Sequence, residues 1–337
     1  MQNKDFIASI GNTPLIFLKS LSELTGAEVY GKAEFMNPGG SVKDRAALGM
    51  IEDAEEKGLL KKGGLIVEAT AGNTGIGLSL IGNMKGYRVK LLVPSSQSQE
   101  KFDTLRGVGA EVLAIAPAPY PSPLNYRIMA AQVAKDEGGY YINQFENEAN
   151  WKAHYKTTGP EIWKQTDETV TGFTCAIGSG GTLAGVSNYL KGKNPKIEIG
   201  CTDPADSSMH NYFSRGEAVP SSGCSVSEGI GQCAITANVK PCKVDYSHPL
   251  TDEMILNMVH YIVKKEGIFL GSSSGANLCG AYLMAKKQGK GGRIVTILCD
   301  SGQKYVSKIY NPEFLKSRNL NVTGLAEDLF PKLDALL

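Results

Sequence analysis

Lys43 stands in a sequence context that could support chemistry at its amino group. It belongs to the segment Pro-Gly-Gly-Ser-Val-Lys-Asp-Arg at 38–45. Residues 27–35 alternate polar and apolar side chains like a strand, and residues 46–51 have helical spacing. Lys43 is therefore predicted where a glycine-rich turn enters a helix, and the N–H groups there favour anions. A lysine at that point can pair with a phosphate or act as an amine nucleophile, but it can equally be a solvated first-turn residue.

A second turn with polar side chains follows a predicted buried strand at 65–68 and precedes a predicted helix at 76–84. Its sequence is Ala-Thr-Ala-Gly-Asn-Thr-Gly. Backbone N–H groups in this turn, with the side chains of Thr70, Asn73 and Thr74, could bind a carboxylate. Taken alone, the same residues are better explained as an ordinary helix cap.

A third turn joins a predicted strand at 172–177 to a predicted helix at 183–190. It reads Gly-Ser-Gly-Gly-Thr at 178–182, and its glycines allow a ligand to approach the backbone closely. No Gly-Lys-Ser/Thr follows, as a P-loop would need, and Leu183 replaces the third glycine of a G-x-G-x-x-G motif. We interpret this turn as a phosphate-binding loop, with a plain glycine turn as the alternative.

The combination of these turns indicates one cofactor. An amine nucleophile together with a phosphate-binding loop is typical of pyridoxal phosphate, whose aldehyde forms a Schiff base with lysine. A run of serines at 272–274 precedes another predicted helix, and its simplest interpretation is a helix cap. The four histidines are far apart in the sequence, which disfavours a metal site, and no G-x-S-x-G motif is present.

The elements that must position these residues alternate between strand-like and helical segments, as in a mainly parallel α/β sheet. Further strands are expected at 88–94, 111–115, 140–143, 198–204 and 294–298. Further helices are expected at 99–108, 124–136, 151–165, 251–266 and 325–337. Residues 8–16 are expected to form a turn and an extended segment, and residues 205–250 to be irregular. The alternate prolines of 117–123, with Tyr120 among them, predict an extended surface connection.

Composition sets the class of protein. The chain has 337 residues, enough for about two domains, with 42% hydrophobic and 20% charged residues. A net charge of +1 gives no indication of nucleic-acid or anionic-membrane binding, and no apolar run approaches the ~20 residues of a membrane span. Residues 1–5 lack the apolar core of a signal peptide. Seven cysteines without a C-x-x-C pair suggest free thiols in a reducing compartment, so we expect a cytoplasmic protein.

Taken together, the motifs resemble the cysteine synthase (O-acetylserine sulfhydrylase) family. This family lies within the β-family (fold type II) of pyridoxal-phosphate enzymes, which includes cystathionine β-synthase. The resemblance runs from Ile-Gly-Asn-Thr-Pro-Leu at 10–15 to about Asn-Pro-Glu-Phe at 311–314. It implies a two-domain α/β fold with mainly parallel twisted sheets covered by helices, and a homodimer.

The resemblance also implies where the domains lie. Residues 45–147 would form a smaller, mobile domain that binds the substrate carboxylate and closes to exclude water. Residues 1–44 and 148–318 would form the larger, cofactor-binding domain, and residues 319–337 a C-terminal tail.

Individual roles follow from the same resemblance. Lys43 would hold the cofactor as a Schiff base and serve as acid and base, and Asn73 would bond the ring hydroxyl. Ser273 would face the pyridine nitrogen, and its hydroxyl cannot keep that nitrogen protonated as an aspartate would. The phosphate would be bound by Gly178, Ser179, Gly180, Gly181 and Thr182. The substrate carboxylate would be bound at Thr70, Ala71, Gly72, Thr74 and Gln144. Ala71 replaces the serine of many family members, which removes one hydroxyl from this group.

The implied activity is a β-replacement, of transferase or lyase type, that forms L-cysteine from O-acetylserine or another activated serine and sulfide. Cystathionine synthesis, cyanoalanine synthesis and sulfide-releasing cysteine breakdown are alternatives with the same cofactor. An alternative of another class is a non-catalytic sensor of sulfide or acetylserine that binds a partner protein. A nucleotide-binding module is disfavoured by the missing P-loop lysine.

Overall fold

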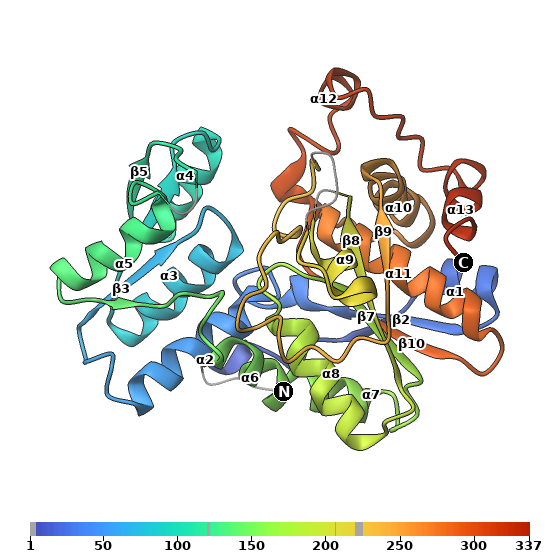
Figure 1. Cartoon of the computed structure of the whole chain (residues 1–337), viewed down its shortest axis with the longest axis horizontal. Helices are drawn as coiled ribbons and strands as arrows, with labels where there is room; N and C mark the ends of the chain where they lie inside the picture. The colour runs from blue at the N-terminus through green and yellow to red at the C-terminus, as the bar shows by residue number, and fades with distance from the viewer. Residues whose placement is uncertain (1–4, 120–121, 206, 220–224) are drawn as a thin grey trace. The chain divides into compact units, whose positions relative to one another are not determined.

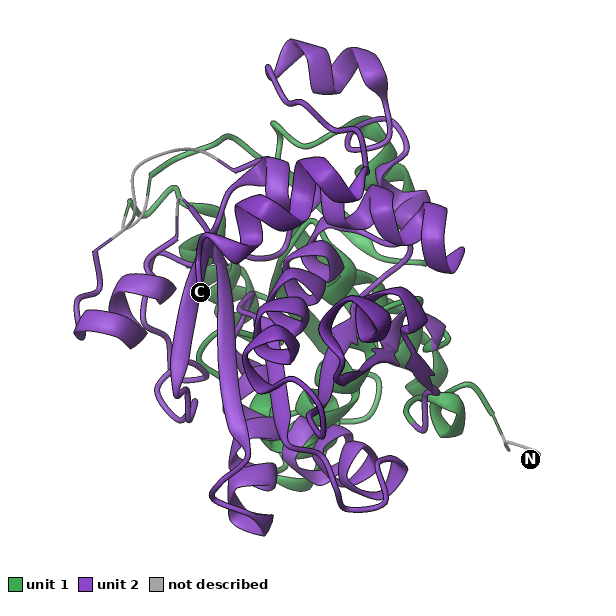
Figure 2. Ribbon diagram, turned by 90° about the vertical axis from the view of Figure 1, so that its right-hand side faces the viewer, with its two compact units in different colours: residues 1–11, 37–153 green, residues 12–36, 154–337 purple. Residues whose placement is uncertain are grey.

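The structure is a computed structural model that describes residues 5–119, 122–205, 207–219 and 225–337 (Figure 1). Tyr120 and Pro121 of the proline-rich segment lie outside the described residues, as do parts of 205–250. The chain divides into two compact units, which Figure 2 colours separately. Unit 1 comprises residues 1–11 and 37–153, and unit 2 comprises residues 12–36 and 154–337. The smaller domain expected at 45–147 falls inside unit 1, and its mobility stays a prediction.

Unit 1 contains a four-stranded parallel sheet in the order β5-β4-β3-β6. Its strands are β3 (Leu65–Ala69), β4 (Arg88–Pro94), β5 (Glu111–Ile115) and β6 (Tyr140–Tyr141). Its helices are η1 (Ile7–Ser9), α2 (Lys43–Glu56), α3 (Asn73–Lys85), α4 (Gln99–Gly107) and α5 (Tyr126–Asp136), and α6 (Ala149–Lys156) runs across its last residue.

The sheet of unit 1 is covered on both faces, which explains its continuous apolar strands. All five residues of β3 are buried. Leu65 and Val67 pack with Ala130 and Ala134 of α5, whereas Ile66 packs with residues of α2 and α3 on the other face. A strand buried on both faces has no need of polar alternation, which is why β3 is apolar apart from the buried Glu68.

Unit 2 contains a six-stranded sheet in the order β1-β2-β10-β7-β8-β9. Only the β1–β2 pair is antiparallel among the strands of the described residues. The strands are β1 (Leu15–Phe17), β2 (Glu28–Ala33), β7 (Gly172–Ala176), β8 (Glu198–Pro204), β9 (Tyr246–Leu250) and β10 (Arg293–Leu298). The helices are α1 (Lys19–Thr25), η2 (Glu34–Met36), α7 (Thr158–Gln165), α8 (Gly181–Lys193), α9 (Met209–Arg215), α10 (Asp252–Glu266), α11 (Ser272–Gln288), η3 (Gly302–Tyr305), α12 (Pro312–Ser317) and α13 (Ala326–Asp334).

Helix α11 forms the centre of the unit 2 core. Its residues from 272 to 285 are all buried, and it packs between α10 and the strands β7, β8 and β10. Gly280 allows this close packing, because a Cβ atom there would lie 2.6 Å from Thr202 Cγ2 on β8. A helix buried all round, unlike an amphipathic one, needs apolar and small residues on every face.

Most expected elements are confirmed, and β4, β5 and β8 have the predicted bounds. The single helix expected at 151–165 is wrong, because the chain forms α6 and α7 with a break at Thr157. Pro160 explains the break: it has no N–H group to donate to the carbonyl of Lys156, and its ring clashes with a helical carbonyl four residues earlier.

The expectation that 205–250 is irregular is also wrong in part. Helix α9 and strand β9 lie inside this range, and β9 pairs with β8 in parallel. Pro249 lies within β9, which hides the strand in the sequence. Because β9 is at the edge of the sheet, a proline without an N–H group is tolerated there. Among the described residues, no helix is both long and apolar enough to cross a membrane.

Candidate active site

Lys43 is the first residue of α2, and the turn before it is fixed by its own residues. The Lys43 N–H donates to Ser41 Oγ (3.2 Å), and Gly39 N–H donates to Asp44 Oδ2 (2.6 Å). Gly40 has a φ of +77°, a conformation that glycine adopts without strain. The Lys43 side chain is half-buried, whereas Asp44 is almost fully buried. The glycine-rich turn therefore holds the backbone of Lys43 in one geometry.

The 70–74 turn leads into α3 through Gly72, which makes no side-chain cap to the helix. The Thr70 hydroxyl accepts from Gly72 N–H (3.2 Å), and a Cβ atom at Gly72 would meet nothing within 4 Å. The first-turn N–H groups of α3 therefore have no side-chain cap, and there is open space beside Gly72. This is the arrangement that an anion needs at a helix N-terminus.

Gln144 and Thr74 meet although seventy residues separate them. The Thr74 hydroxyl donates to Gln144 Oε1 at 2.7 Å, and both side chains are buried. The backbone carbonyl of Gln144 accepts from Asn150 Nδ2 (2.8 Å). The buried Glu68 carboxylate accepts from the backbone and side-chain amides of Gln144 (3.3 and 3.4 Å). Sequence reasoning selected Thr74 and Gln144 but missed Glu68 and Asn150.

Helix packing brings the start of α2 beside the first turns of α3. A Cβ atom at Gly77 would lie 3.4 Å from the Cα atom of Asp44, the residue after Lys43. Gly77 is one turn beyond Asn73, the first residue of α3. Ala71, by contrast, packs as a partly buried residue against the apolar cluster of this unit.

The 178–182 loop follows β7 and enters α8 without a side-chain cap. Gly180 has a φ of +96°, and a Cβ atom there would lie 2.7 Å from the Asn238 carbonyl oxygen. Any other residue would therefore be strained in conformation and would also clash. Since α8 is 13 residues long and its first N–H groups have no side-chain cap, the loop and helix can receive a phosphate.

Three residues from other segments hold this loop, and sequence reasoning missed all of them. His154 Nε2 lies 3.3 Å from Thr182 Oγ1, and His154 Nδ1 lies 2.8 Å from Thr158 Oγ1. Thr236 donates to the Ser179 carbonyl (3.4 Å). The Cys242 thiol lies 3.8 Å from the Gly180 carbonyl oxygen, and burial raises its pKa, so it remains a protonated donor. The sequence marks His154 only as one of four histidines.

The three serines at the start of α11 have different partners. Ser272 Oγ accepts from Glu228 N–H (3.4 Å), and Ser274 Oγ accepts from Cys299 N–H (2.8 Å). Ser273, 8% exposed, has no protein hydrogen-bond partner for its hydroxyl among the residues that the structure describes. Its hydroxyl is therefore the one of the three that remains available to a ligand.

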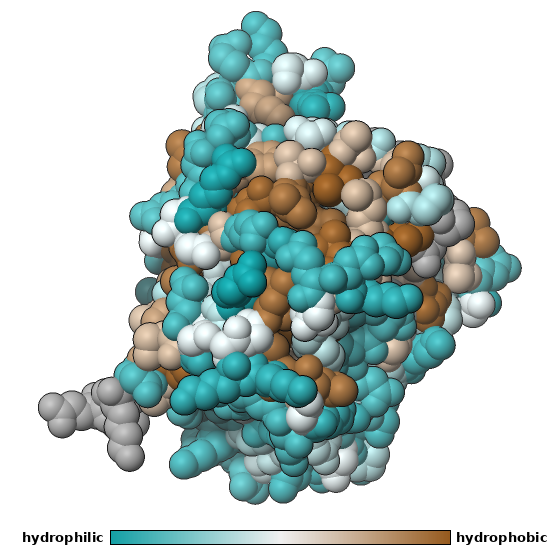
Figure 3. Space-filling view, turned by 90° about the vertical axis from the view of Figure 1, so that its left-hand side faces the viewer, coloured by the Kyte–Doolittle hydropathy of each residue, from teal (hydrophilic) through white to brown (hydrophobic). Residues whose placement is uncertain are grey.

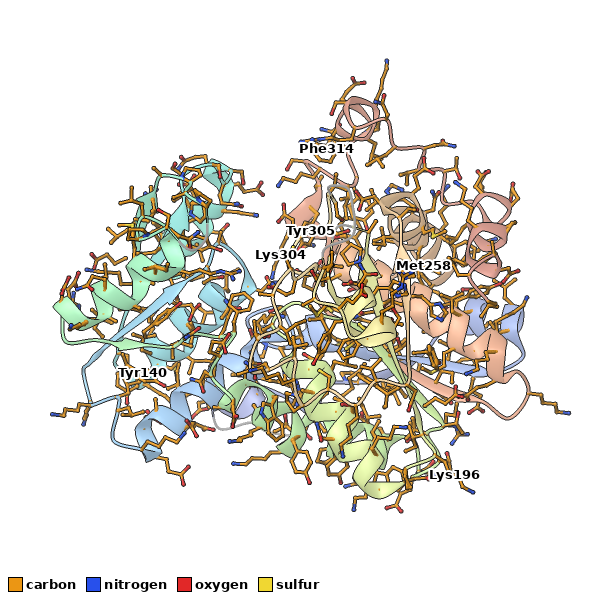
Figure 4. All side chains as sticks on the ribbon, viewed as in Figure 1. Tyr140, Lys196, Met258, Lys304, Tyr305 and Phe314 are labelled. Atoms are coloured by element: carbon orange, nitrogen blue, oxygen red, sulfur yellow. The ribbon has the colours of Figure 1, made fainter. Side chains whose placement is uncertain are left out.

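The turn before α11 is held from the other side by the segment that follows β10. Tyr305, labelled in Figure 4, donates from its hydroxyl to Asp300 Oδ2 (2.7 Å). Gly271 N–H donates to the Asp300 carbonyl, and the Tyr310 hydroxyl donates to the Leu270 carbonyl. These bonds fix where the helix begins and so where Ser273 lies.

Within unit 2, Ser273 and the 178–182 loop are brought to the same end of β7. Asn277, one turn after Ser273, accepts at Oδ1 from the N–H of Ala176, the last residue of β7 (2.6 Å). Residues 178–182 follow directly. Ligands bind at the carboxyl ends of parallel strands in α/β folds. The predicted site residues of unit 2 therefore lie near the carboxyl end of β7.

In each unit separately, the residues singled out have the chemistry that one or more groups of pyridoxal phosphate need. The uncapped start of α8 fits the phosphate, the available Ser273 hydroxyl fits a ring nitrogen, and Lys43 supplies an amine for the aldehyde. Among the described residues, no group of three or more His, Cys, Asp or Glu side chains could bind a metal ion.

Comparisons with known proteins agree with this chemistry. The model of a family described as "Pyridoxal-phosphate dependent enzyme" matches residues 7–300. The chain is 48% identical to "Cysteine synthase 1" of Neurospora crassa over 94% of this chain and 86% of that protein. It is 47% identical to "Cysteine synthase 1" of Emericella nidulans, covering 93% and 86% of the two chains. The crystal structure of an O-acetylserine-dependent cystathionine β-synthase from Helicobacter pylori superposes with a TM-score of 0.83 at 32% identity, covering 92% of this chain and all of that one.

Proposed function

The chain belongs to the pyridoxal-phosphate-dependent enzyme family, and on that premise we propose that it forms L-cysteine from O-acetylserine, or another activated serine, and sulfide. The observation that carries this proposal is the identity of 47–48% to two cysteine synthases over more than nine-tenths of the chain. A similarity of that extent covers all three turns on which the chemistry depends. The reaction is a β-replacement, in which a thiol group replaces the leaving group on the β-carbon.

Lys43 is the proposed catalytic residue. When bound, pyridoxal phosphate supplies an aldehyde that reacts with amines and a conjugated ring that accepts electrons. Lys43 would hold the cofactor through its amino group and would be free to act as a base once a substrate is bound. Its Nζ then takes the proton from the α-carbon of the substrate and returns it after the nucleophile has added. The fixed turn at 38–44 supports this role, because a general base must be held close to its proton.

The substrate carboxylate is proposed to bind at the start of α3. The uncapped N–H groups after Gly72 and the hydroxyls of Thr70 and Thr74 are donors of the kind that a carboxylate needs. Gln144 contacts Thr74 and completes the group. Ala71 contributes its backbone but no hydroxyl.

The cofactor is proposed to be bound by residues of three turns. Backbone N–H groups and hydroxyls at 178–182 bind the phosphate, and Asn73 bonds the ring hydroxyl. Ser273 bonds the ring nitrogen. Because a neutral hydroxyl does not hold a proton on that nitrogen, the ring withdraws electrons less strongly, and loss of the β-substituent is favoured over transamination.

The test is a visible absorption spectrum of the purified protein, combined with a substitution of Lys43. Protein saturated with pyridoxal phosphate should absorb in the visible region, and the band should move to longer wavelength when O-acetylserine is added. Lys43→Ala should lack the original band and turn over at least about 100-fold more slowly, the usual effect of losing an acid–base group. Lys61→Ala, an exposed lysine of the same unit, is the control and should behave like wild type. Normal turnover in Lys43→Ala would refute the assignment.

Cystathionine formation is the second candidate, supported by the similarity to the Helicobacter pylori enzyme. The two activities differ only in the nucleophile, so sulfide and homocysteine should be compared at equal concentration with O-acetylserine. A higher kcat/KM with homocysteine would favour this second candidate. Cyanide in place of sulfide, and L-cysteine alone, test the cyanoalanine and cysteine-degrading alternatives in the same assay.

A homodimer and a cytoplasmic location complete the proposal. Figure 3 shows hydrophobic residues gathered on part of one face, among hydrophilic ones. Large apolar side chains that are exposed include Met36 and Leu124. Apolar surface of this kind is often covered in an assembly. Light scattering of the purified protein should give about twice the chain mass of 36.0 kDa, and fractionation of the source cells tests the location.

A further inference from the structure

Glu68 is a buried carboxyl group whose contacts lead to the proposed carboxylate site. It lies on β3, has no exposed surface, and touches Gln144 twice. Gln144 in turn contacts Thr74. A chain of side chains therefore runs from the centre of the sheet to the first turn of α3.

The charge on Glu68 determines the direction of these hydrogen bonds. An ionised carboxylate only accepts, so Gln144 must turn its NH₂ group toward Glu68 and its oxygen toward Thr74. The Thr74 hydroxyl then gives its proton to Gln144 Oε1, at 2.7 Å. In this state the Thr74 proton is not available to a ligand.

Protonation of Glu68 permits the opposite direction. A neutral carboxyl group can donate to the oxygen of Gln144, which turns the NH₂ group toward Thr74. Thr74 then accepts from Gln144 and keeps its own proton for another acceptor. A substrate carboxylate is such an acceptor, and a neutral Glu68 also removes a like charge from below it.

We propose that Glu68 is a positioning residue that sets the direction of the Thr74–Gln144 hydrogen bond, so that binding of the substrate carboxylate is coupled to uptake of one proton by Glu68 from solvent. This inference rests on the proposed function, because it deepens the role of the same carboxylate site. The substrate therefore binds more tightly to the protein with Glu68 protonated.

The surroundings of Glu68 bring the pKa of its carboxyl group into the pH range of ordinary enzyme assays. Burial raises the pKa of Glu68 to about 7, against the lowering effect of hydrogen bonds from Gln144 and from the backbone of Ala69 and Asn143. Burial and these bonds, rather than nearby charges, dominate the shift. The titratable groups on the elements packed against β3, and just after Gln144, are Lys43, Asp44, Arg45, Glu52, Asp53, Glu55 and Glu56 of α2, Lys85 of α3, Arg88 and Lys90 of β4, Tyr126, Arg127, Lys135 and Asp136 of α5, Tyr140 and Tyr141 of β6, and Glu146 and Glu148. Lys85 is paired with Glu55, and Lys90 with Glu111 and Glu137.

The first measurement is the pH profile of KM for O-acetylserine in wild type and Glu68→Gln, each saturated with pyridoxal phosphate. Glutamine resembles the neutral acid, since it can donate and accept but cannot ionise. Between pH 6 and 8 the wild-type KM should rise about tenfold more than that of the variant, because the protonated fraction of a group with a pKa near 7 falls about tenfold. The effect on KM should exceed that on kcat, which a merely structural defect would not produce.

The second measurement is calorimetry of L-alanine binding in buffers of different ionisation enthalpy. L-alanine has the α-carboxylate but no leaving group, so this readout does not require turnover. At pH 7.5 wild type should take up more protons than Glu68→Gln, with a difference of up to about three-quarters of a proton, the fraction of a group with a pKa of about 7 that is ionised at that pH. Glu68→Asp, which retains a titratable carboxyl group, should keep a proton uptake and serves if the glutamine variant folds poorly. Glu55→Gln, at a carboxylate bound by Lys85 and Tyr87, is the matched control and should resemble wild type.

The outcomes separate this proposal from the proposed function. Cysteine formation with identical KM profiles in wild type and Glu68→Gln, or equal proton numbers, would overturn the role of Glu68 alone. Proton uptake that depends on Glu68 in a protein that makes no cysteine would support the coupling and refute the activity. If L-alanine does not bind at all, the carboxylate site itself is wrong.

Discussion

At the scale of single residues, the chemistry depends on which polar groups are already bound to the protein. Ser272 and Ser274 each accept from a backbone N–H group, and Ser273 between them has no such partner among the described residues. A hydroxyl bound to the backbone positions a loop, whereas an available one can bind a ligand. This difference supports the proposed contact of Ser273 with the cofactor ring.

Replacing Ser273 by aspartate tests that contact. An aspartate would hold a proton on the ring nitrogen and strengthen electron withdrawal beyond what β-replacement needs. We expect turnover with O-acetylserine and sulfide to fall at least about tenfold, equivalent to about 1.4 kcal/mol in the barrier. Ser273→Asn has the same shape without the charge and should lose less activity. Equal rates in wild type and Ser273→Asp would count against the assignment.

At the scale of elements, the helices that follow the predicted site turns of each unit start without a side-chain cap from the residue before them. Val42, Gly72, Gly180 and Gly271 directly precede α2, α3, α8 and α11, and none of these four residues caps its helix, although Ser41 accepts a hydrogen bond from the first N–H group of α2. By contrast, Asn125 and Thr251 cap α5 and α10. Leaving a helix start uncapped gives up stability, about 1 kcal/mol for each cap, but it leaves N–H groups available for an anion.

Two glycines at opposite ends of α8 provide a matched test of the phosphate loop. Gly180→Ala should be destabilising by about 1–3 kcal/mol, because φ is +96° and the new Cβ would meet the Asn238 carbonyl. It should also weaken binding of pyridoxal phosphate. Gly192→Ala meets nothing within 4 Å and should leave cofactor affinity unchanged, with stability raised by up to about 1 kcal/mol. Urea unfolding and cofactor titration measure both effects, and equal cofactor affinity in the two variants would contradict the phosphate assignment.

At the scale of the whole molecule, partly buried histidines link stability to pH. The pKa values of His210, His248 and His260 are all lowered, in each case chiefly because burial disfavours the charged ring. A histidine whose folded-state pKa lies below its unfolded value opposes folding once it must be protonated. Its favourable contribution is present above the unfolded pKa near 6.5 and is lost as pH falls below that value.

As pH is lowered from 7.5 to 5, the three histidines should lower the midpoint of thermal unfolding and contribute a pH slope, whereas protonation of Glu68, whose pKa is raised, acts in the opposite direction. His260→Gln should reduce that slope, because glutamine cannot be protonated, yet its NH₂ group can replace the bond from His260 Nε2 to the Ile309 carbonyl. Other titrating groups are shared by the two proteins and cancel in the comparison. An identical pH slope in wild type and variant would show that His260 does not contribute.

The sequence by itself determined the features that depend on neighbouring residues. Strands β4, β5 and β8, the glycine-rich turns before α2 and α8, and the type of cofactor could all be predicted from it. These predictions use properties of short segments: apolar periodicity, turn residues and a lysine within a local motif. The folded protein keeps such local structure whenever the packing of the whole chain is consistent with it.

Only the tertiary structure decided which polar groups meet. Glu68 and Gln144 are 76 residues apart, and His154 and Thr182 are 28 apart. Neither pair has a local signature, because their contacts arise from the order of strands in a sheet and from the packing of one helix on another. The available hydroxyl among three serines, the break between α6 and α7 and the edge strand β9 were decided in the same way. Two groups form a hydrogen bond only if the fold brings them close together, and the spacing of residues along the sequence does not specify whether it does.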